Sequence, residues 1–141
     1  DNGQVINSDL VVASDGYPSS SAKEAKIKYF DNNYNQSSIV GIFKHKIPHD
    51  SEAIQIFLPS GPLAILPLPG NRSSFVWTMK NNDAIRIFNL SDLLFLKELS
   101  AALQNRRGKI EFESKRNMFP ISLAFSKSLV KEKFVIIKTL K

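Results

Sequence analysis

Cysteine is absent from the 141 residues, which excludes disulfide bonds, thiolate nucleophiles and zinc sites built on thiolates. No apolar run approaches the roughly 20 residues that a membrane-spanning helix requires. Residues 1–10 have neither the basic region nor the apolar core of a signal peptide. Hydrophobic residues at 43% and charged residues at 23% are ordinary values for a globular domain. We therefore expect a soluble domain in the cytoplasm.

Glycine is scarce and scattered, so neither a G-x-G-x-x-G loop nor a Walker loop can be drawn in the chain. The two histidines, His45 and His49, lie four residues apart on an extended segment that Pro48 interrupts, where they would not share a face as on a helix. We expect them to be exposed loop residues, and we expect no metal site.

The net charge of +6 is spread among acidic residues and is not concentrated in one basic block. Without a nucleic-acid-reading motif, this charge does not indicate a nucleic-acid partner. Glu111 and Glu113 alternate with apolar residues, which is typical of the solvated face of a strand and not of an acid–base pair. The serines at 19–21 suit a helix cap or a turn.

Alternating apolar and polar residues predict strands over most of the chain. A short apolar run at 10–13 suits a buried strand, and 37–44 suits a strand covered on both sides. Residues 53–59 alternate in the same way, and the runs 61–68 and 72–78 form a hairpin around Pro69-Gly70-Asn71. These segments predict a meander of about four strands.

Between about 91 and 104 the apolar residues recur at three and four residues, which predicts the main helix, with Ser91 as its N-cap. A shorter helix is expected after the serines near the N-terminus, and further strands at 109–115 and 133–139. The class is therefore α+β, with a mostly antiparallel but mixed sheet, one main helix and a short N-terminal helix.

The segment 9–21, DLVVASDGYPSSS, resembles the strand and Asp-Gly signature of flavin-dependent aromatic hydroxylases. Asp15, Gly16 and Ser19 match it, and the resemblance implies that they contact the cofactor. Ala22 stands where these enzymes often have an arginine.

The central segment 49–78 resembles the ubiquinone-biosynthesis branch of these hydroxylases, the 2-octaprenyl-6-methoxyphenol hydroxylase type. The matching positions are His49, Ala53, Phe57, Gly61 to Ala64, Leu66 to Leu68, Val76 and Trp77. The segment 115–126 continues the resemblance with Arg116, Phe119, Pro120 and Ile121.

This resemblance implies a fold like the substrate domain of p-hydroxybenzoate hydroxylase and its relatives. It also implies FAD and NADPH in the complete enzyme and a polyprenyl phenol as substrate. The prolines of 61–69 would stiffen an apolar wall and mark edges or bends. We expect Phe57, Ala64 and Leu66 on its substrate side, while about half of the apolar residues are core. Peripheral contact with the inner membrane would suit the apolar substrate.

The resemblance divides the chain into 1–30, a remnant of the FAD domain; 31–130, the substrate-binding sheet; and 131–141, a last strand. Lys138 and Thr139 stand where these enzymes have Gly and Asp of an FAD loop. We therefore expect this chain to bind no FAD and to be inactive alone. The alternative is a non-catalytic binding or scaffold module that pairs with a flavin-domain chain or with a second copy of itself.

Overall fold

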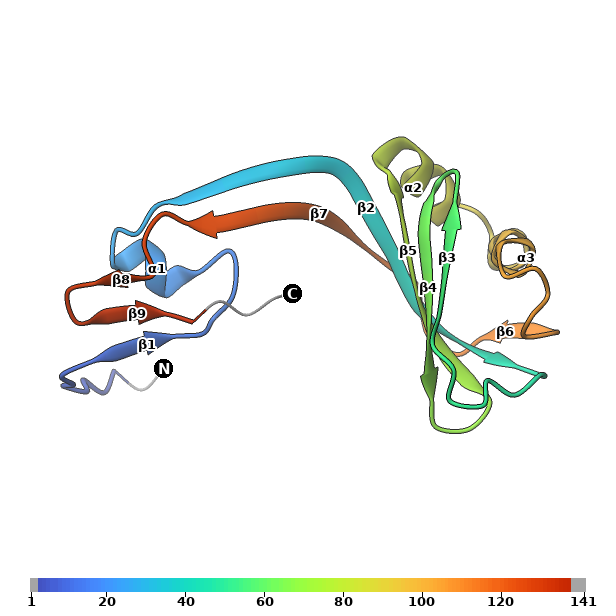
Figure 1. Ribbon diagram of the computed structural model, residues 1–141, viewed down its shortest axis with the longest axis horizontal. Helices are drawn as coiled ribbons and strands as arrows, with labels where there is room; N and C mark the ends of the chain where they lie inside the picture. The colour runs from blue at the N-terminus through green and yellow to red at the C-terminus, as the bar shows by residue number, and fades with distance from the viewer. Residues whose placement is uncertain (1–2, 138–141) are drawn as a thin grey trace. The chain divides into compact units, whose positions relative to one another are not determined.

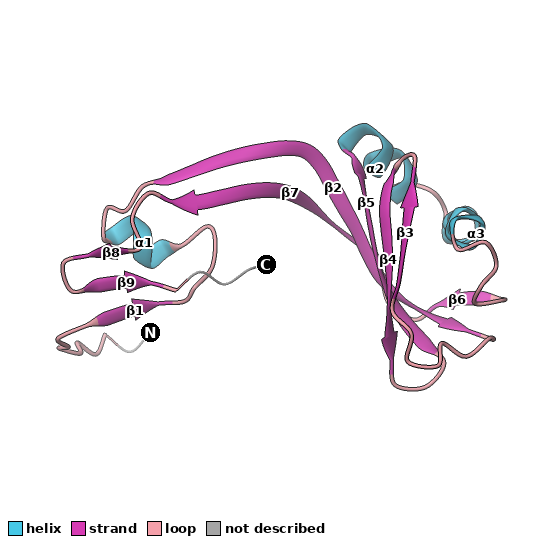
Figure 2. Cartoon of the chain, viewed as in Figure 1, coloured by secondary structure: helices cyan, strands magenta, loops and turns pink. Residues whose placement is uncertain are grey.

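The computed structural model describes residues 3–137, which form two compact units (Figure 1). Unit 1 comprises the described residues up to Asn32 and from Leu123 onward, and unit 2 comprises Asn33–Ser122. Strands β2 (Tyr29–His45) and β7 (Asn117–Ser126) contribute residues to both units. Strands account for most of the regular structure, as Figure 2 shows.

Unit 2 is built on a sheet with the order β3-β4-β5-β2-β6, and β7 pairs with β2. Its other strands are β3 (Ile54–Leu58), β4 (Gly61–Leu68), β5 (Arg72–Lys80) and β6 (Ile110–Phe112). The β4–β5 hairpin turns at residues 69–71, as predicted, and Leu68 pairs with Arg72. The expected four-strand meander is wrong in one respect, because β2 pairs with β5 and not with β3.

The prolines of β4 lie where the strand has one neighbour. Pro62 pairs with Phe57 of β3 beyond the end of the β5 ladder, and Pro67 pairs with Ser73 of β5 beyond the end of the β3 ladder. A residue without an N–H is tolerated at such positions because a ladder bond is missing there anyway. Although β4 is an inner strand, its prolines therefore sit at its ends.

Helices α2 (Asn81–Phe88) and α3 (Asp92–Ala102) cover one face of this sheet. Their buried residues Ala84, Ile87, Phe95 and Leu99 share one core with the buried side chains of the strands. Leu63, Ile65, Phe75 and Trp77 of the β4–β5 hairpin all lie in this core.

The main helix begins after Ser91, whose hydroxyl accepts a hydrogen bond from the Leu94 N–H, as expected of an N-cap. The buried side of α3 is carried by Phe95 and Leu99, while Leu93 is exposed. Helix α2 was not predicted from the sequence. It follows β5 directly, and Lys80 at its N-cap makes no side-chain hydrogen bond to the helix.

Unit 1 contains a small sheet with the order β1-β9-β8, formed by β1 (Val11–Ala13), β8 (Val130–Lys131) and β9 (Phe134–Ile136). Strands β1 and β9 are parallel, so the fold is mixed as expected. Helix α1 (Ser20–Glu24) packs Ala22 against Ile27 and Ile136. The prediction that 10–13 is buried is wrong, since only Ala13 of that run is buried. Lys138 and Thr139 lie outside the described residues.

Candidate functional site

The sheet of unit 2 has a second face that carries the candidate substrate residues. Because side chains alternate across a strand, burial of the odd-numbered residues of β2, β4 and β5 turns the even-numbered ones to the opposite face. On β3 the alternation is reversed, so that Phe57 pairs with Pro62 on this same face. We call this surface the open face; it is formed by Val40, Ile42, Gln55, Phe57, Pro62, Ala64, Leu66, Ser74 and Val76.

The three predicted substrate residues therefore share one face. Ala64 pairs with Val76, and Leu66 pairs with Ser74 one step further along the ladder. Exposure rises toward the edge strand: Ala64 is half-buried, Leu66 is 44% exposed and Phe57 is 81% exposed. Removing exposed apolar surface from water is favourable, so this face is suited to contact with a ligand or with a second protein surface.

Hydroxyl groups lie along the same face. The Ser38 and Thr78 hydroxyls are 2.6 Å apart and satisfy each other. Ser74 lies between Ile42 of β2 and Leu66 of β4, and its hydroxyl makes no hydrogen bond with other described residues. The open face thus combines an apolar surface with one available hydroxyl near Leu66.

The predicted cofactor residues lie in unit 1, in the turn between β1 and α1. The Asp15 carboxylate accepts hydrogen bonds from the Ser19 hydroxyl at 2.7 Å, the Ser20 hydroxyl at 3.3 Å and the Ser21 N–H at 3.1 Å. The Ser19 hydroxyl also accepts the Ala22 N–H and so caps α1. Both side chains are therefore occupied in holding the turn.

The hydrogen bond from Ser19, followed by that from Ser21, holds the pKa of Asp15 well below its ordinary value. An ionised carboxylate repels a phosphate, so Asp15 fits the role of a turn anchor and does not fit that of a phosphate ligand. Gly16 has a φ of +77° and lines a cavity of about 50 Å³ with Tyr17, Tyr29 and Ile136. The absence of a side chain at Gly16 permits close approach to its backbone.

The histidines differ from the sequence prediction, because His45 is buried and His49 is partly buried. His45 Nδ1 lies 2.8 Å from the Ile47 carbonyl oxygen, and Nε2 lies 3.0 Å from the Ser73 hydroxyl. His49 Nδ1 accepts the Ser51 N–H, so its Nε2 carries the proton donated to the Leu68 carbonyl oxygen at 2.8 Å.

This Ser73–His45 pair has the hydrogen bond of a hydrolytic dyad, but Ser73 is fully buried and no substrate can reach it. The pair ties the end of β2 to β5 instead, and the Ile47 contact of His45 adds the loop before β3. Among the described residues, no group of three or more His, Asp or Glu side chains is placed to hold a metal ion.

Arg116 is one of the positions that match the hydroxylase family, but the sequence alone indicated no role for it. Its guanidinium lies 4.5 Å from the centre of the Phe95 ring, and Nη2 donates to the Leu90 carbonyl oxygen and to Asp92 Oδ1. A cation over an aromatic face, with hydrogen bonds to a neighbouring turn, fixes the α2–α3 connection to the core. Arg116 therefore acts on the helix-covered side of the sheet and not on the open face.

The architecture occurs in solved flavoenzymes. The flavin-dependent halogenase CmlS matches with a TM-score of 0.74 and 14% identity, over 93% of this chain and 25% of that one. Aklavinone-11 hydroxylase, solved with FAD and aklavinone, matches with a TM-score of 0.68 and 12% identity, over 90% of this chain and 25% of that one. The fold is that of the substrate-binding domain of FAD-dependent hydroxylases and their structural neighbours, as predicted.

Sequence comparison identifies the branch. The ubiquinone hydroxylase UbiL of Rhodospirillum rubrum is 32% identical over 96% of this chain and 32% of its own length. The ubiquinone biosynthesis monooxygenase COQ6 of Danio rerio is 30% identical over 87% of this chain and 26% of its own length. No family model matches the chain.

The chain is thus a relative of the ubiquinone-biosynthesis flavin hydroxylases, which confirms the resemblance. It spans about a third or less of the length of these curated relatives.

Proposed function

We propose that the chain forms the substrate-binding part of a flavin-dependent monooxygenase that hydroxylates a polyprenyl phenol in ubiquinone biosynthesis. The observation that carries this proposal is the open face, an exposed apolar sheet surface in a chain whose relatives are named ubiquinone hydroxylases. Phe57, Ala64 and Leu66 would contact the apolar part of the phenol and keep water from it. The Ser74 hydroxyl would hydrogen-bond to a ring oxygen and orient the ring.

FAD, reduced by NADPH, would supply the oxygen-activating chemistry of the complete enzyme. In this chain, the Gly16 backbone would approach the flavin, with Asp15 and Ser19 holding the turn in shape. The 141 residues include no glycine-rich phosphate loop, so the diphosphate of FAD would need contacts from outside them. We therefore expect no turnover by this chain alone.

Exposed apolar residues in unit 1 support a protein partner that completes the cofactor site. Leu10, Val11, Val12 and Val130 are about half exposed on or beside the β1-β9-β8 sheet. A flavin-domain polypeptide that covers them would gain the free energy of burying that surface. The second candidate function, a non-catalytic module that binds prenylated phenols or associates with itself, rests on the same exposure.

Peripheral association with a membrane would bring the open face near a polyprenyl substrate. None of the helices in the described part of the chain is long and apolar enough to span a bilayer. The net positive charge would favour an anionic lipid surface.

Calorimetric titration of the chain with a geranylated phenol tests the proposed function. Leu66→Asp places a charge on the open face, and we expect it to abolish binding. Ile85→Asp is the matched control, because Ile85 is exposed to a similar degree, 49%, on helix α2. Binding that Leu66→Asp and Ile85→Asp weaken equally, or no binding at all, would refute the proposal. Addition of FAD and NADPH to the bound complex then tests the expectation that this chain does not turn over alone, which product formation would contradict.

A further inference from the structure

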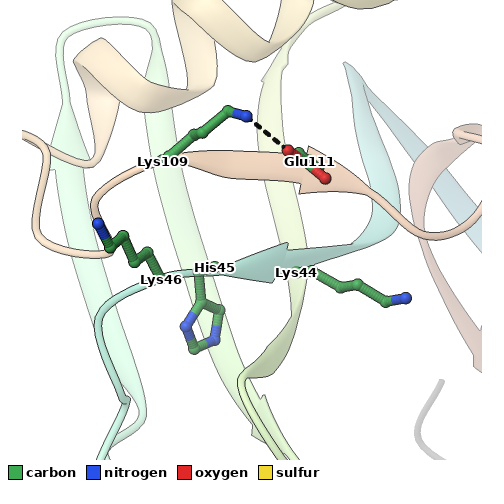
Figure 3. Close-up of a pocket in the computed structure, with 5 residues that line it drawn as sticks. All are labelled: Lys44, His45, Lys46, Lys109 and Glu111. Atoms are coloured by element: carbon green, nitrogen blue, oxygen red, sulfur yellow. Dashed lines mark ion pairs between the residues drawn. The ribbon is translucent and has the colours of Figure 1, made fainter.

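At one end of the open face the side chains become charged. Lys44 and Lys46 continue the even-numbered positions of β2, and Lys109 and Glu111 come from the neighbouring strand β6 and the residue before it. Together with the backbone at His45 they line a hollow of about 250 Å³, which we call the basic hollow (Figure 3). The His45 ring points away from it, toward its hydrogen-bond partners Ser73 and the Ile47 carbonyl.

Backbone hydrogen bonds fix the walls of the basic hollow. Lys44 pairs with Glu111 in the β2–β6 ladder, and the Lys46 N–H donates to the Lys109 carbonyl oxygen at 3.1 Å. Gly108 has a φ of +64°, and a methyl group there would lie 3.1 Å from Ile47 Cγ1. Glycine at this position therefore allows the segment before β6 to lie against the end of β2, which places Lys46 and Lys109 side by side.

The charges in the basic hollow do not balance. Lys109 Nζ lies 2.8 Å from Glu111 Oε1, and Lys44 Nζ lies 3.8 Å from Glu113, whose other oxygen binds Arg72 at 2.5 Å. The hydrogen bond and charge of Lys109 lower the pKa of Glu111, and Glu111 in turn raises the pKa of Lys109, so both are charged at neutral pH. Lys46 forms no ion pair with other described residues. The side chains that line the basic hollow thus carry three ammonium groups and one carboxylate, and Lys44 is also paired with Glu113 outside it.

We propose that the basic hollow binds a phosphate group as a dianion. The lining residues carry three positive charges and one negative charge, and this net positive charge complements a phosphomonoester, which lysine ammonium groups bind as point charges. The volume is below the roughly 300–1,000 Å³ of pockets that enclose drug-sized molecules, which favours a small anionic group. That group would belong to inorganic phosphate and small phosphomonoesters, or to the headgroup of an anionic lipid such as phosphatidic acid.

The test is a titration of the full ¹⁵N-labelled chain with inorganic phosphate at constant ionic strength, followed by amide NMR shifts. We expect saturable shifts at residues 44–46 and 109–111. Lys46→Ala should weaken the affinity about 30-fold and Glu111→Gln should strengthen it about 30-fold, which is the effect of one unit charge on a dianion at contact distance in water. Lys97→Ala, which removes an exposed lysine of α3, is the control and should leave the affinity unchanged.

Vesicles distinguish the two sources of phosphate. Co-sedimentation with phosphatidylcholine vesicles containing phosphatidic acid, lost in Lys46→Ala and absent without phosphatidic acid, would support a lipid headgroup as the source. Saturable binding of phosphate without such co-sedimentation would support a soluble ligand. The proposal is overturned if neither occurs, or if Lys46→Ala and Lys97→Ala lower the affinity equally.

Discussion

Truncating Phe57 should weaken binding of a prenylated phenol far more than it changes the stability of the chain. Burying a whole Phe side chain is worth about 1.5–3 kcal/mol, and the 81% exposure of Phe57 leaves nearly all of that gain for the ligand. Phe57→Ala should therefore cost about 2 kcal/mol of binding free energy, or about 30-fold in Kd. Leu66 is 44% exposed, so Leu66→Ala should cost about half as much, roughly fivefold in Kd.

The assay is calorimetric titration with a geranylated phenol, together with urea unfolding of each variant. Ile85→Ala removes a similarly exposed aliphatic side chain from helix α2 and serves as the control. The order of effects should be Phe57→Ala, then Leu66→Ala, with no change for Ile85→Ala. Equal Kd values for all three variants, or a larger effect at Ile85, would show that the ligand does not lie on the open face.

Three further predictions concern stability. Ser73→Ala should lower the unfolding free energy by about 1–3 kcal/mol, because it leaves the buried His45 Nε2 without a partner, while Ser74→Ala on the open face should have almost no effect; similar urea midpoints for the two would contradict this. Gly61→Ala should lower the unfolding free energy strongly, since its methyl group would overlap the Thr78 carbonyl oxygen. Gly70 has open space around it, so Gly70→Ala should lower the unfolding free energy by only about 1 kcal/mol. Thermal unfolding of the two variants measures the difference. Because hydrogen bonds lower the pKa of Asp15 in the folded state, its contribution to stability is present above about pH 4 and is lost as the pH falls further. The difference in melting temperature between wild type and Asp15→Asn should therefore shrink below about pH 4. A difference that does not change with pH would refute this role of the Asp15 carboxylate.

Local patterns predicted the elements whose signals lie within a few residues. Alternation identified β3, β4 and β5, and the cap at Ser91 with its apolar spacing identified α3. The face shared by Phe57, Ala64 and Leu66 also follows from alternation once the β3–β4 register is known. Their role in binding substrate, and that of Asp15, Gly16 and Ser19 in binding cofactor, stay predictions.

The features that sequence reasoning missed depend on distant partners. His45 was expected to be an exposed loop residue because Pro48 interrupts the extended segment that carries it, yet the Ser73 hydroxyl, 28 residues away, lies within hydrogen-bond distance of its ring. The strand signal is weak in the first half of β2, which is polar and shows no alternation, and in β7, which contains Pro120. Helix α2 is short and has no side-chain cap, so its stability comes from burying Ala84 and Ile87 against the sheet.

The parallel pairing of β1 with β9 has a consequence for the order of folding. Val11 pairs with Phe134, so this contact closes a loop that contains all of unit 2. During synthesis the hairpin of β4 and β5 and the helices after it can pack as soon as they emerge. Strand β1 cannot form its ladder until residues 134–136 have been made, so its valines stay unpaired until then. Non-local closure thus makes the small sheet the late and vulnerable step in biogenesis.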